Sequence, residues 1–369
     1  MELLSVIKDL IRFKSITGNT EEINKCIDYI LPLFEKTGAV VEVFKGVEKA
    51  PVLMIKNTNE ENLDVLVLGH LDVVPASDDM FEPTIKDGKM YGRGSLDMKS
   101  FAAVGLKSME YVLKNNLNIK FGIILSSDEE KGSHGTHSFL EAHSDLNAKI
   151  VLDNDVGGSV YRIINACKNP VFIKIMVKGL EAHGSTPWDG IDANEKLMLV
   201  WGKIREIYPY FSKDTTGKPK HTWIDTVHFA KISGGDVANV ISNYAEALLG
   251  FRLTDTSTLD DLKKNLDKCM LAGVSYDIVS SSNTVVMDKN NHYIQDYKTL
   301  AEEILESEIK FEQIGGATDS RAFYLRGADI IMHSGTGEGM HADGEYVEID
   351  SVEKISDIQI NFLKKLANA

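Results

Sequence analysis

Two side chains that could do chemistry close an apolar run early in the chain. The stretch "VLVLGHLDVVP" (66–76) has the pattern of a buried strand and contains His70 and Asp72. Because side chains alternate along a strand, residues two apart share a face, so this histidine and this carboxylate lie together. The carboxylate could hold one imidazole nitrogen and leave the other for a metal ion. Alternatively, the two groups could only satisfy each other.

Further metal-competent groups follow other predicted strands and turns. Asp97 follows a glycine-bearing turn in "GRGSLDMK", where it could also serve as a helix N-cap. Glu129 and Glu130 follow the apolar strand "IKFGIILSS"; being adjacent, they face different ways, so one could bind metal while the other acts as a base. A solvated charge run is the alternative reading of this pair. His341 lies in the loop "GMHADGEY". Imidazole and carboxylate groups are the usual ligands of zinc where cysteine is absent.

A third strand also ends in carboxylates. The run "AKIVLDND" (148–155) is apolar up to Asp153 and carries Asp155 two residues later. Three strands therefore deliver metal-competent groups at their carboxyl ends, which is where open α/β sheets bind ligands. This repetition favours a metal site.

Composition excludes several classes of function. The chain of 369 residues is 43% hydrophobic, enough for two cores, and its formal charge of −15 argues against a nucleic-acid partner. No apolar run approaches the roughly 18 residues of a membrane span, and the N-terminus resembles an amphipathic helix rather than a signal peptide, so we expect a cytoplasmic protein. Three isolated cysteines predict neither disulfides nor a thiolate zinc site.

The order of predicted elements indicates a discontinuous domain with an insert. Helical periodicity at 2–13, 21–37, 97–116 and 133–143 alternates with strand patterns at 39–45, 50–57, 63–70, 119–127 and 148–155. From 171 to 281 the pattern is β-α-β-β-α-β, and the α/β texture returns near 290. We expect a metal-binding catalytic domain of residues 1–166 and 283–369 and an inserted domain of residues 167–282.

A series of short motifs resembles one family of enzymes. In chain order they are "GHLDVVP", "YGRGSLDMK", "SSDEEKGS", "KGLEAHGSTPWDG", "ISGGDVANVI", "GGATDSRAF" and "HADGEYV". Together they resemble the two-zinc hydrolases that include acetylornithine deacetylase, succinyl-diaminopimelate desuccinylase, carboxypeptidase G and related dipeptidases. The resemblance implies an α/β zinc-hydrolase (phosphorylase/hydrolase-like) catalytic domain with an inserted ferredoxin-like α+β domain that forms a homodimer.

The resemblance also implies a set of metal ligands. It implies that His70 and Asp153 bind one zinc, that Glu130 and His341 bind the other, and that Asp97 bridges the two. The peptide bond from Asp97 to Met98 is expected to be cis. At the third strand, alignment on the apolar run selects Asp153, whereas alignment on the following glycines selects Asp155. We prefer Asp153 because it follows the strand directly.

The remaining implied roles concern the reaction and its substrate. Glu129 would be the general base, and Asp72 would orient His70. His183 would reach in from the partner subunit. A substrate carboxylate would be bound by Asn239, Arg252 and Arg321. The leading hypothesis is release of an amino acid from an N-acyl amino acid with two Zn ions bound. Alternatives are a dipeptidase or carboxypeptidase, a non-catalytic binding protein on the same fold, and a single-metal or Mn- or Co-loaded enzyme.

Overall fold

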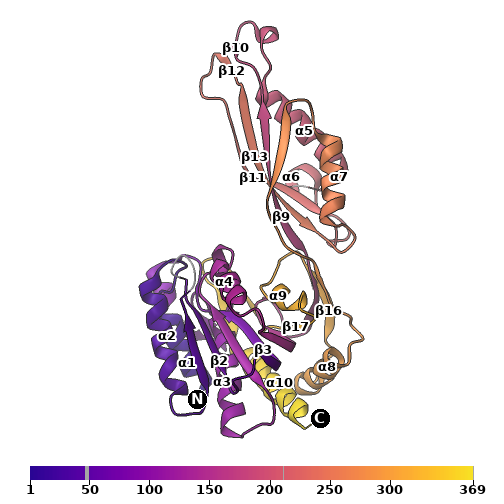
Figure 1. The fold of residues 1–369 in the computed structure, drawn as a ribbon. Coiled ribbons are helices and arrows are strands. Elements are labelled where there is room, and N and C mark those ends of the chain that lie inside the picture. Colours follow the sequence, from indigo (N-terminus) through magenta and orange to yellow (C-terminus); the bar gives the residue numbers. More distant parts are fainter. Residues whose placement is uncertain (46–49, 211, 369) are drawn as a thin grey trace. The chain divides into compact units, whose positions relative to one another are not determined.

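The computed structural model describes residues 1–45, 50–210 and 212–368, and the chain divides into two compact units (Figure 1). The first unit comprises Met1–Asn165, Met287–Glu312 and Thr318–Ala369, and the second comprises Ala166–Val286 and Gln313–Ala317. The expected boundaries at 166/167 and 282/283 lie close to these. The structure adds one detail, because the short segment 313–317 belongs to the second unit.

A nine-stranded mixed sheet runs through the first unit. Its order is β1 (Val40–Phe44), β2 (Val52–Lys56), β6 (Phe121–Ser126), β3 (Asn62–His70), β7 (Asn147–Asp153), β17 (Asp329–Met332), β8 (Arg162–Cys167) and β15 (Val285–Val286), with β16 (Lys310–Ile314) also paired to β8. The central pairs β3–β6, β3–β7 and β7–β17 are parallel. The carboxyl ends of these strands therefore share one edge of the sheet, as the sequence predicts.

Helices complete this unit. They are α1 (Leu3–Arg12), α2 (Thr20–Phe34), α3 (Lys99–Lys114), α4 (His134–Ala142), α8 (His292–Leu305), α9 (Arg321–Tyr324) and α10 (Ile349–Ala367), with 3-10 turns η2 (Asp78–Phe81) and η3 (Glu129–Lys131). Helix α3 packs against β3, β6, α1 and α10, and most of its side chains are buried. This burial holds α3 firmly in the core. Because Asp97 lies just before the helix, its backbone is held in a fixed position.

A second, small sheet of the first unit was not expected from the sequence. It pairs β18 (Gly337–Glu338), β19 (Tyr346–Glu348), β5 (Lys89–Tyr91) and β4 (Thr84–Lys86) in that order. The predicted loop "GMHADGEY" lies between β18 and β19 and overlaps the start of β19, and strands of two or three residues leave no periodic pattern in the sequence. This sheet brings the chain before Asp97 beside the chain after His341.

The second unit has the predicted β-α-β-β-α-β order. Its four-stranded antiparallel sheet has the order β11 (Thr226–Gly234), β13 (Tyr244–Leu253), β9 (Asn169–Lys178) and β14 (Val274–Ser281). The helices are α5 (Ala193–Ile207), α6 (Lys213–Thr216) and α7 (Leu259–Cys269). A short ribbon pairs β10 (Ala182–His183) with β12 (Val240–Ile241), and the turn η4 (Pro187–Asp189) contacts β10.

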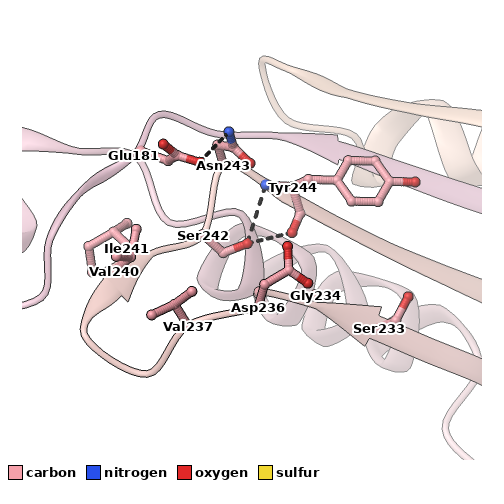
Figure 2. A pocket seen from close by; sticks show the side chains of 11 residues that line it. Glu181, Ser233, Gly234, Asp236, Val237, Val240, Ile241, Ser242, Asn243 and Tyr244 are labelled. Atoms are coloured by element: carbon pink, nitrogen blue, oxygen red, sulfur yellow. Dashed lines mark hydrogen bonds between the residues drawn. The ribbon is translucent and has the colours of Figure 1, made fainter.

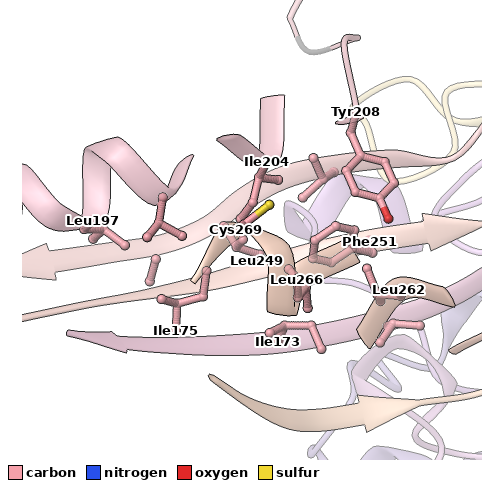
Figure 3. Close-up of a cluster of buried hydrophobic side chains, with 14 of the residues drawn as sticks. Ile173, Ile175, Leu197, Ile204, Tyr208, Leu249, Phe251, Leu262, Leu266 and Cys269 are labelled. Atoms are coloured by element: carbon pink, nitrogen blue, oxygen red, sulfur yellow. The ribbon is translucent and has the colours of Figure 1, made fainter. Parts of the chain in front are cut away.

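The core of the second unit lies between its sheet and two helices (Figure 3). Alternate residues of β9, including Ile173 and Ile175, are buried, which is the period of two expected for a sheet covered on one face. They meet Leu197 and Ile204 from α5 and Leu266 from α7. The inserted α+β fold is therefore confirmed. Among the residues that the structure describes, no helix has both the length and the apolar character needed to cross a membrane.

Candidate metal centre

The candidate site lies where the parallel strands end. His70 is the last residue of β3 and pairs with Ser126, the last residue of β6. Glu129 and Glu130 follow β6 in the turn η3. The other neighbour of β3, β7, ends at Asp153. The register of the sheet thus gathers imidazole and carboxylate groups that are far apart in the sequence.

One group of possible metal ligands contains His70, Asp97 and Asp155, whose ligand atoms lie within 4.8 Å of one another. The Nε2 atom of His70 is 3.1 Å from Oδ1 of Asp97 and 3.8 Å from Oδ2 of Asp155. His70 is almost fully buried, with its side chain 1% exposed. A buried imidazole facing two carboxylates is an arrangement that a divalent cation would neutralise.

A second group shares one of these residues. It contains Asp97, Glu130 and His341, again within 4.8 Å. The Nε2 atom of His341 lies 2.9 Å from Oδ2 of Asp97 and 2.9 Å from Oε2 of Glu130. Asp97 therefore directs one oxygen to each group, and the Asp97–Met98 peptide bond is cis, as expected. His341 is 51% exposed, so solvent reaches this side of the site.

Asp72 supports both His70 and the acidic turn. The backbone carbonyl of Asp72 faces Nδ1 of His70 at 2.9 Å, and its Oδ1 lies 3.4 Å from the same nitrogen. Oδ1 also accepts a hydrogen bond from the backbone N–H of Glu129 at 3.2 Å. Its Oδ2 accepts from the backbone N–H of Glu130 at 3.4 Å and from the hydroxyl of Thr17 at 2.7 Å. Sequence reasoning placed Asp72 beside His70 but missed Thr17, because a threonine in an irregular segment gives no signal of its own.

The crowded carboxylates have shifted pKa values. Burial raises the pKa of Glu129 to about 9, with a further contribution from the charge of Asp155. Burial and then Asp97 raise the pKa of Glu130 to about 7 and that of Asp155 to about 6. Although burial opposes it, hydrogen bonds from His341 and His70 lower the pKa of Asp97. Several acidic groups thus compete for too little positive charge.

The residues present fit a metal pair. Within the described chain, Oε1 of Glu130 is buried without a hydrogen-bond partner, which is costly unless a cation faces it. The donor atoms are imidazole nitrogens and carboxylate oxygens, a set that suits Zn, Co or Mn. The three cysteines are buried as thiols, and none of them belongs to either group.

The structure differs from our preference at the end of β7. Asp155, rather than Asp153, lies with His70 in the first group. The carboxylate of Asp153 is fully buried and accepts hydrogen bonds from the hydroxyl of Thr318 and, at 2.9 Å, from the backbone N–H of Asp155. Asp153 does end the strand as predicted, but its side chain points toward Thr318. Asp155, two residues later, is the carboxylate that faces His70.

A small cavity borders the first group. It has a volume of about 10 Å³ and is lined by His70, Glu129, Asp155 and Asp319, among others. Asp319 accepts a hydrogen bond from the hydroxyl of Ser133 at 2.7 Å, and Ser133 follows the acidic turn in the chain. The sequence analysis did not single out this aspartate. Arg321, two residues later, is anchored by a hydrogen bond from Nε to the carbonyl of Thr318 at 2.6 Å.

Two of the residues predicted in the inserted unit lie together. His183 pairs with Val240 across the short ribbon, and the next residue, Gly184, donates a backbone hydrogen bond to the carbonyl of Asn239 at 2.7 Å. An open pocket of about 300 Å³ lies beside them, lined by Glu181 and Val240 among others (Figure 2). His183 is exposed, with Nδ1 2.7 Å from the hydroxyl of Ser185.

The third predicted residue of this unit lies elsewhere. Arg252 is near the end of β13, opposite Thr226 and Pro170, whereas Tyr244, at the start of β13, lines the pocket beside Val240. Eight residues of extended strand span about 27 Å. Within one copy of the unit, Arg252 and the His183–Asn239 pair are therefore too far apart to contact one small molecule.

Comparison with known proteins agrees with this geometry. The chain matches the model of peptidase family M20/M25/M40 over residues 66–365. It is 27% identical to succinyl-diaminopimelate desuccinylase of Rickettsia felis, covering 98% of this chain and 99% of that protein. Among solved structures, a tripeptidase of Staphylococcus aureus superimposes with a TM-score of 0.81 at 18% identity, covering 100% of this chain and 98% of the other. A dinuclear metal-binding peptidase of the M20 family from Bacillus subtilis has a TM-score of 0.72 at 13% identity, covering 99% and 98%.

The family match includes most of the residues assembled at the strand ends. Residues 66–365 contain both groups of possible ligands, the acidic turn and the whole inserted unit. The match to the family model covers most of the chain and leads to one assignment. The chain belongs to peptidase family M20/M25/M40.

Proposed function

We propose that the protein is a metal-dependent hydrolase that releases an amino acid from an N-acyl amino acid. The observation that carries this proposal is the position of Glu129. It lines the cavity with His70 and Asp155 of the first group and precedes Glu130 of the second group in the chain, yet it belongs to neither group. A carboxylate next to a metal pair and free of it can exchange protons with a water molecule and with a leaving group.

The metal pair would be held by five residues. His70 and Asp155 would bind one ion, Glu130 and His341 the other, and Asp97 both. Zinc is the proposed metal, with Co or Mn as alternatives. When bound, such a pair lowers the pKa of water and polarises an amide carbonyl. Asp72 would hold the imidazole of His70 in place through its Nδ1 side.

Glu129 would transfer the proton. Its buried carboxyl would take a proton from the attacking water and deliver it to the nitrogen of the departing amino acid. His183 would stabilise the negative charge that develops on the carbonyl oxygen.

The substrate would carry a carboxylate. Arg252 and Arg321 offer guanidinium groups that can engage both carboxylate oxygens, and Asn239 offers an amide donor. The relative from Rickettsia felis is named for removal of a succinyl group, which supports an acyl amino acid of the succinyl-diaminopimelate or acetylornithine type. The family description, a peptidase family, supports the second candidate, a dipeptidase or carboxypeptidase.

The active form would be a homodimer through the inserted unit. If His183, Asn239 and Arg252 all contact one small substrate, they cannot all come from one inserted unit. About 27 Å of β13 separates Arg252 from Tyr244, which lines the pocket next to the His183–Asn239 pair. In a dimer, His183 and Asn239 of one subunit would contact the substrate at the partner's site, so they would not have to lie near Arg252 of their own subunit.

A substrate panel tests the proposal. Purified protein would be assayed with acetylornithine, succinyl-diaminopimelate, other N-acyl amino acids, dipeptides and tripeptides, each with and without a chelator. Chelator-sensitive release from an acyl amino acid is the expected result. A preference for peptides would establish the second candidate, and no hydrolysis of any amide by metal-loaded protein would contradict both.

A further inference from the structure

Glu345 is a fully buried carboxylate four residues after His341. It lies in the hairpin between β18 and β19. Its oxygens accept four hydrogen bonds: from the backbone N–H groups of Gly94 (3.1 Å), Leu96 (2.8 Å) and Asp97 (3.0 Å) and from Nη1 of Arg93 (2.6 Å). The loop that presents Asp97 is therefore wrapped around a side chain from the loop that presents His341.

Arg93, from the loop before Asp97, bonds in turn to the loop that carries His341. Its Nη1 bonds to Glu345, and its Nη2 donates to the carbonyl of Ala342 at 3.3 Å, next to His341. Arg93 is 2% exposed, so this ion pair is shielded from water. A further backbone hydrogen bond joins Gly92 to the carbonyl of Glu345 at 3.1 Å. The buried pair thus contacts the chain immediately before Asp97 and immediately after His341.

The close approach of the two loops depends on glycine. Gly94 has φ of +85°, and a Cβ there would lie 2.9 Å from Cδ of Lys99. Gly339 has φ of +81°, and a Cβ there would lie 2.9 Å from Cα of Glu345. Left-handed backbone without a side chain lets both loops close over the carboxylate. The loops have little freedom to re-form around a different side chain.

We propose that Glu345 is a positioning residue that sets the separation of Asp97 and His341 and so determines whether the second metal ion binds. The inference rests on the proposed function. Glu345 supports two of the five ligands: Asp97, which belongs to both groups, and His341, which belongs only to the second. The first group therefore has one ligand that depends on Glu345, and the second group has two. Disturbing Glu345 therefore weakens the second group most.

The test is metal binding by Glu345→Gln. Glutamine keeps the shape, but its Nε2 is a donor facing N–H groups or a guanidinium, so part of the set of hydrogen bonds is lost. Chelator-treated protein would be titrated with Co²⁺, followed by calorimetry and by the visible absorption of bound cobalt. We expect two ions in the wild type. In the variant, the second ion should bind about 10- to 100-fold more weakly, and the first, which shares only Asp97 with it, should lose less affinity.

A matched control comes from the same unit. Glu61 pairs with the buried Lys56 at 2.6 Å and immediately precedes β3, at the opposite end of that strand from His70. Glu61→Gln makes the same chemical change to a carboxylate paired with a cation. Its side chain is 40% exposed, and the variant touches neither ligand loop. It is expected to leave both cobalt affinities at the wild-type values, which separates positioning from the loss of one paired negative charge.

The outcomes are distinct. Two ions bound to Glu345→Gln with wild-type affinities would overturn the inference, and wild-type protein that binds no metal would instead overturn the metal centre of the proposed function. If Glu345→Gln does not fold, as judged by circular dichroism, Arg93→Lys replaces it. Lysine keeps the charge but cannot bond to Glu345 and Ala342 at once, so a weakened second ion is again expected, and an unchanged one overturns the inference.

Discussion

The carboxylate of Asp72 accepts a hydrogen bond from the backbone N–H of Glu129 at 3.2 Å. The same oxygen lies 3.4 Å from Nδ1 of His70. One buried aspartate therefore fixes both a candidate metal ligand and the start of the turn that carries the candidate proton carrier. A carboxylate that orients an imidazole is a common supporting group of metal sites; here it also bonds to the backbone of the acidic turn.

Asp72→Asn should impair both functions that Asp72 supports. Asparagine has one accepting oxygen where aspartate has two. It therefore cannot keep every contact that Asp72 makes with His70 and with the backbone N–H groups of the turn at Glu129. We expect metal affinity and kcat each to fall by about 10- to 100-fold, measured by metal titration and steady-state kinetics. Thr17→Val is the matched control, because it removes only one donor to Asp72 and should cause a smaller loss of both. Wild-type values for Asp72→Asn would contradict this role.

Asp155→Asn and Asp153→Asn should have different effects. Asp155 faces His70, so its substitution should weaken binding of the first metal ion. Asp153 bonds to Thr318 and to the backbone of Asp155, so its substitution should mainly lower the free energy of unfolding. Metal titration and denaturant unfolding of both variants separate the two effects. Loss of metal from Asp153→Asn alone would restore the assignment preferred from the sequence.

The stability of the metal-free protein should depend on pH through Glu129. Its pKa is raised from 4.5 to about 9 by burial, so the folded protein holds a proton that the unfolded chain releases. This contribution to stability is fully present below about pH 4.5 and is lost as the pH rises through about 9. We expect the free energy of unfolding of chelator-treated protein to decrease over this range, and to decrease less in Glu129→Gln. Parallel pH profiles for the two proteins would argue against a proton held at Glu129.

His183→Ala should be complemented across the proposed dimer. Mixed with Glu129→Gln after dissociation and reassociation, it would form heterodimers in which one site has both an intact Glu129 and an intact partner His183. Partial recovery of turnover is expected, whereas each variant alone stays impaired. Absence of recovery from demonstrated heterodimers would place His183 outside the partner's site.

Much of the fold followed from periodicity. The sequence predicted the alternating helices and strands, the insert and the strand ends that carry His70 and Glu129, because apolar patterns and chain connectivity are local signals. The small sheet of β4, β5, β18 and β19 was missed, since two- and three-residue strands leave no pattern. Its position depends on long-range contacts such as the Arg93–Glu345 ion pair, whose members are 252 residues apart.

The site was predicted less completely than the fold. Residue type and spacing made His70, Asp97, Glu130 and His341 candidates, and the resemblance to the two-zinc hydrolases implied that they are metal ligands. The structure brings all four together. The choice between Asp153 and Asp155 depended on the direction of one side chain after a strand ends, which periodicity does not determine. Glu345 lay within a recognised motif, yet nothing local shows that a glutamate after a glycine is buried under four hydrogen bonds.

The most direct test of the account is metal restoration of wild-type protein and of Glu129→Gln. Chelator-treated wild-type protein should regain amide hydrolysis as two equivalents of zinc bind. Glu129→Gln should bind the same two ions and remain folded while kcat falls by roughly 10² to 10⁴, the usual contribution of a positioned base. Full turnover by the metal-loaded variant, or wild-type hydrolysis that persists without metal, would contradict the account.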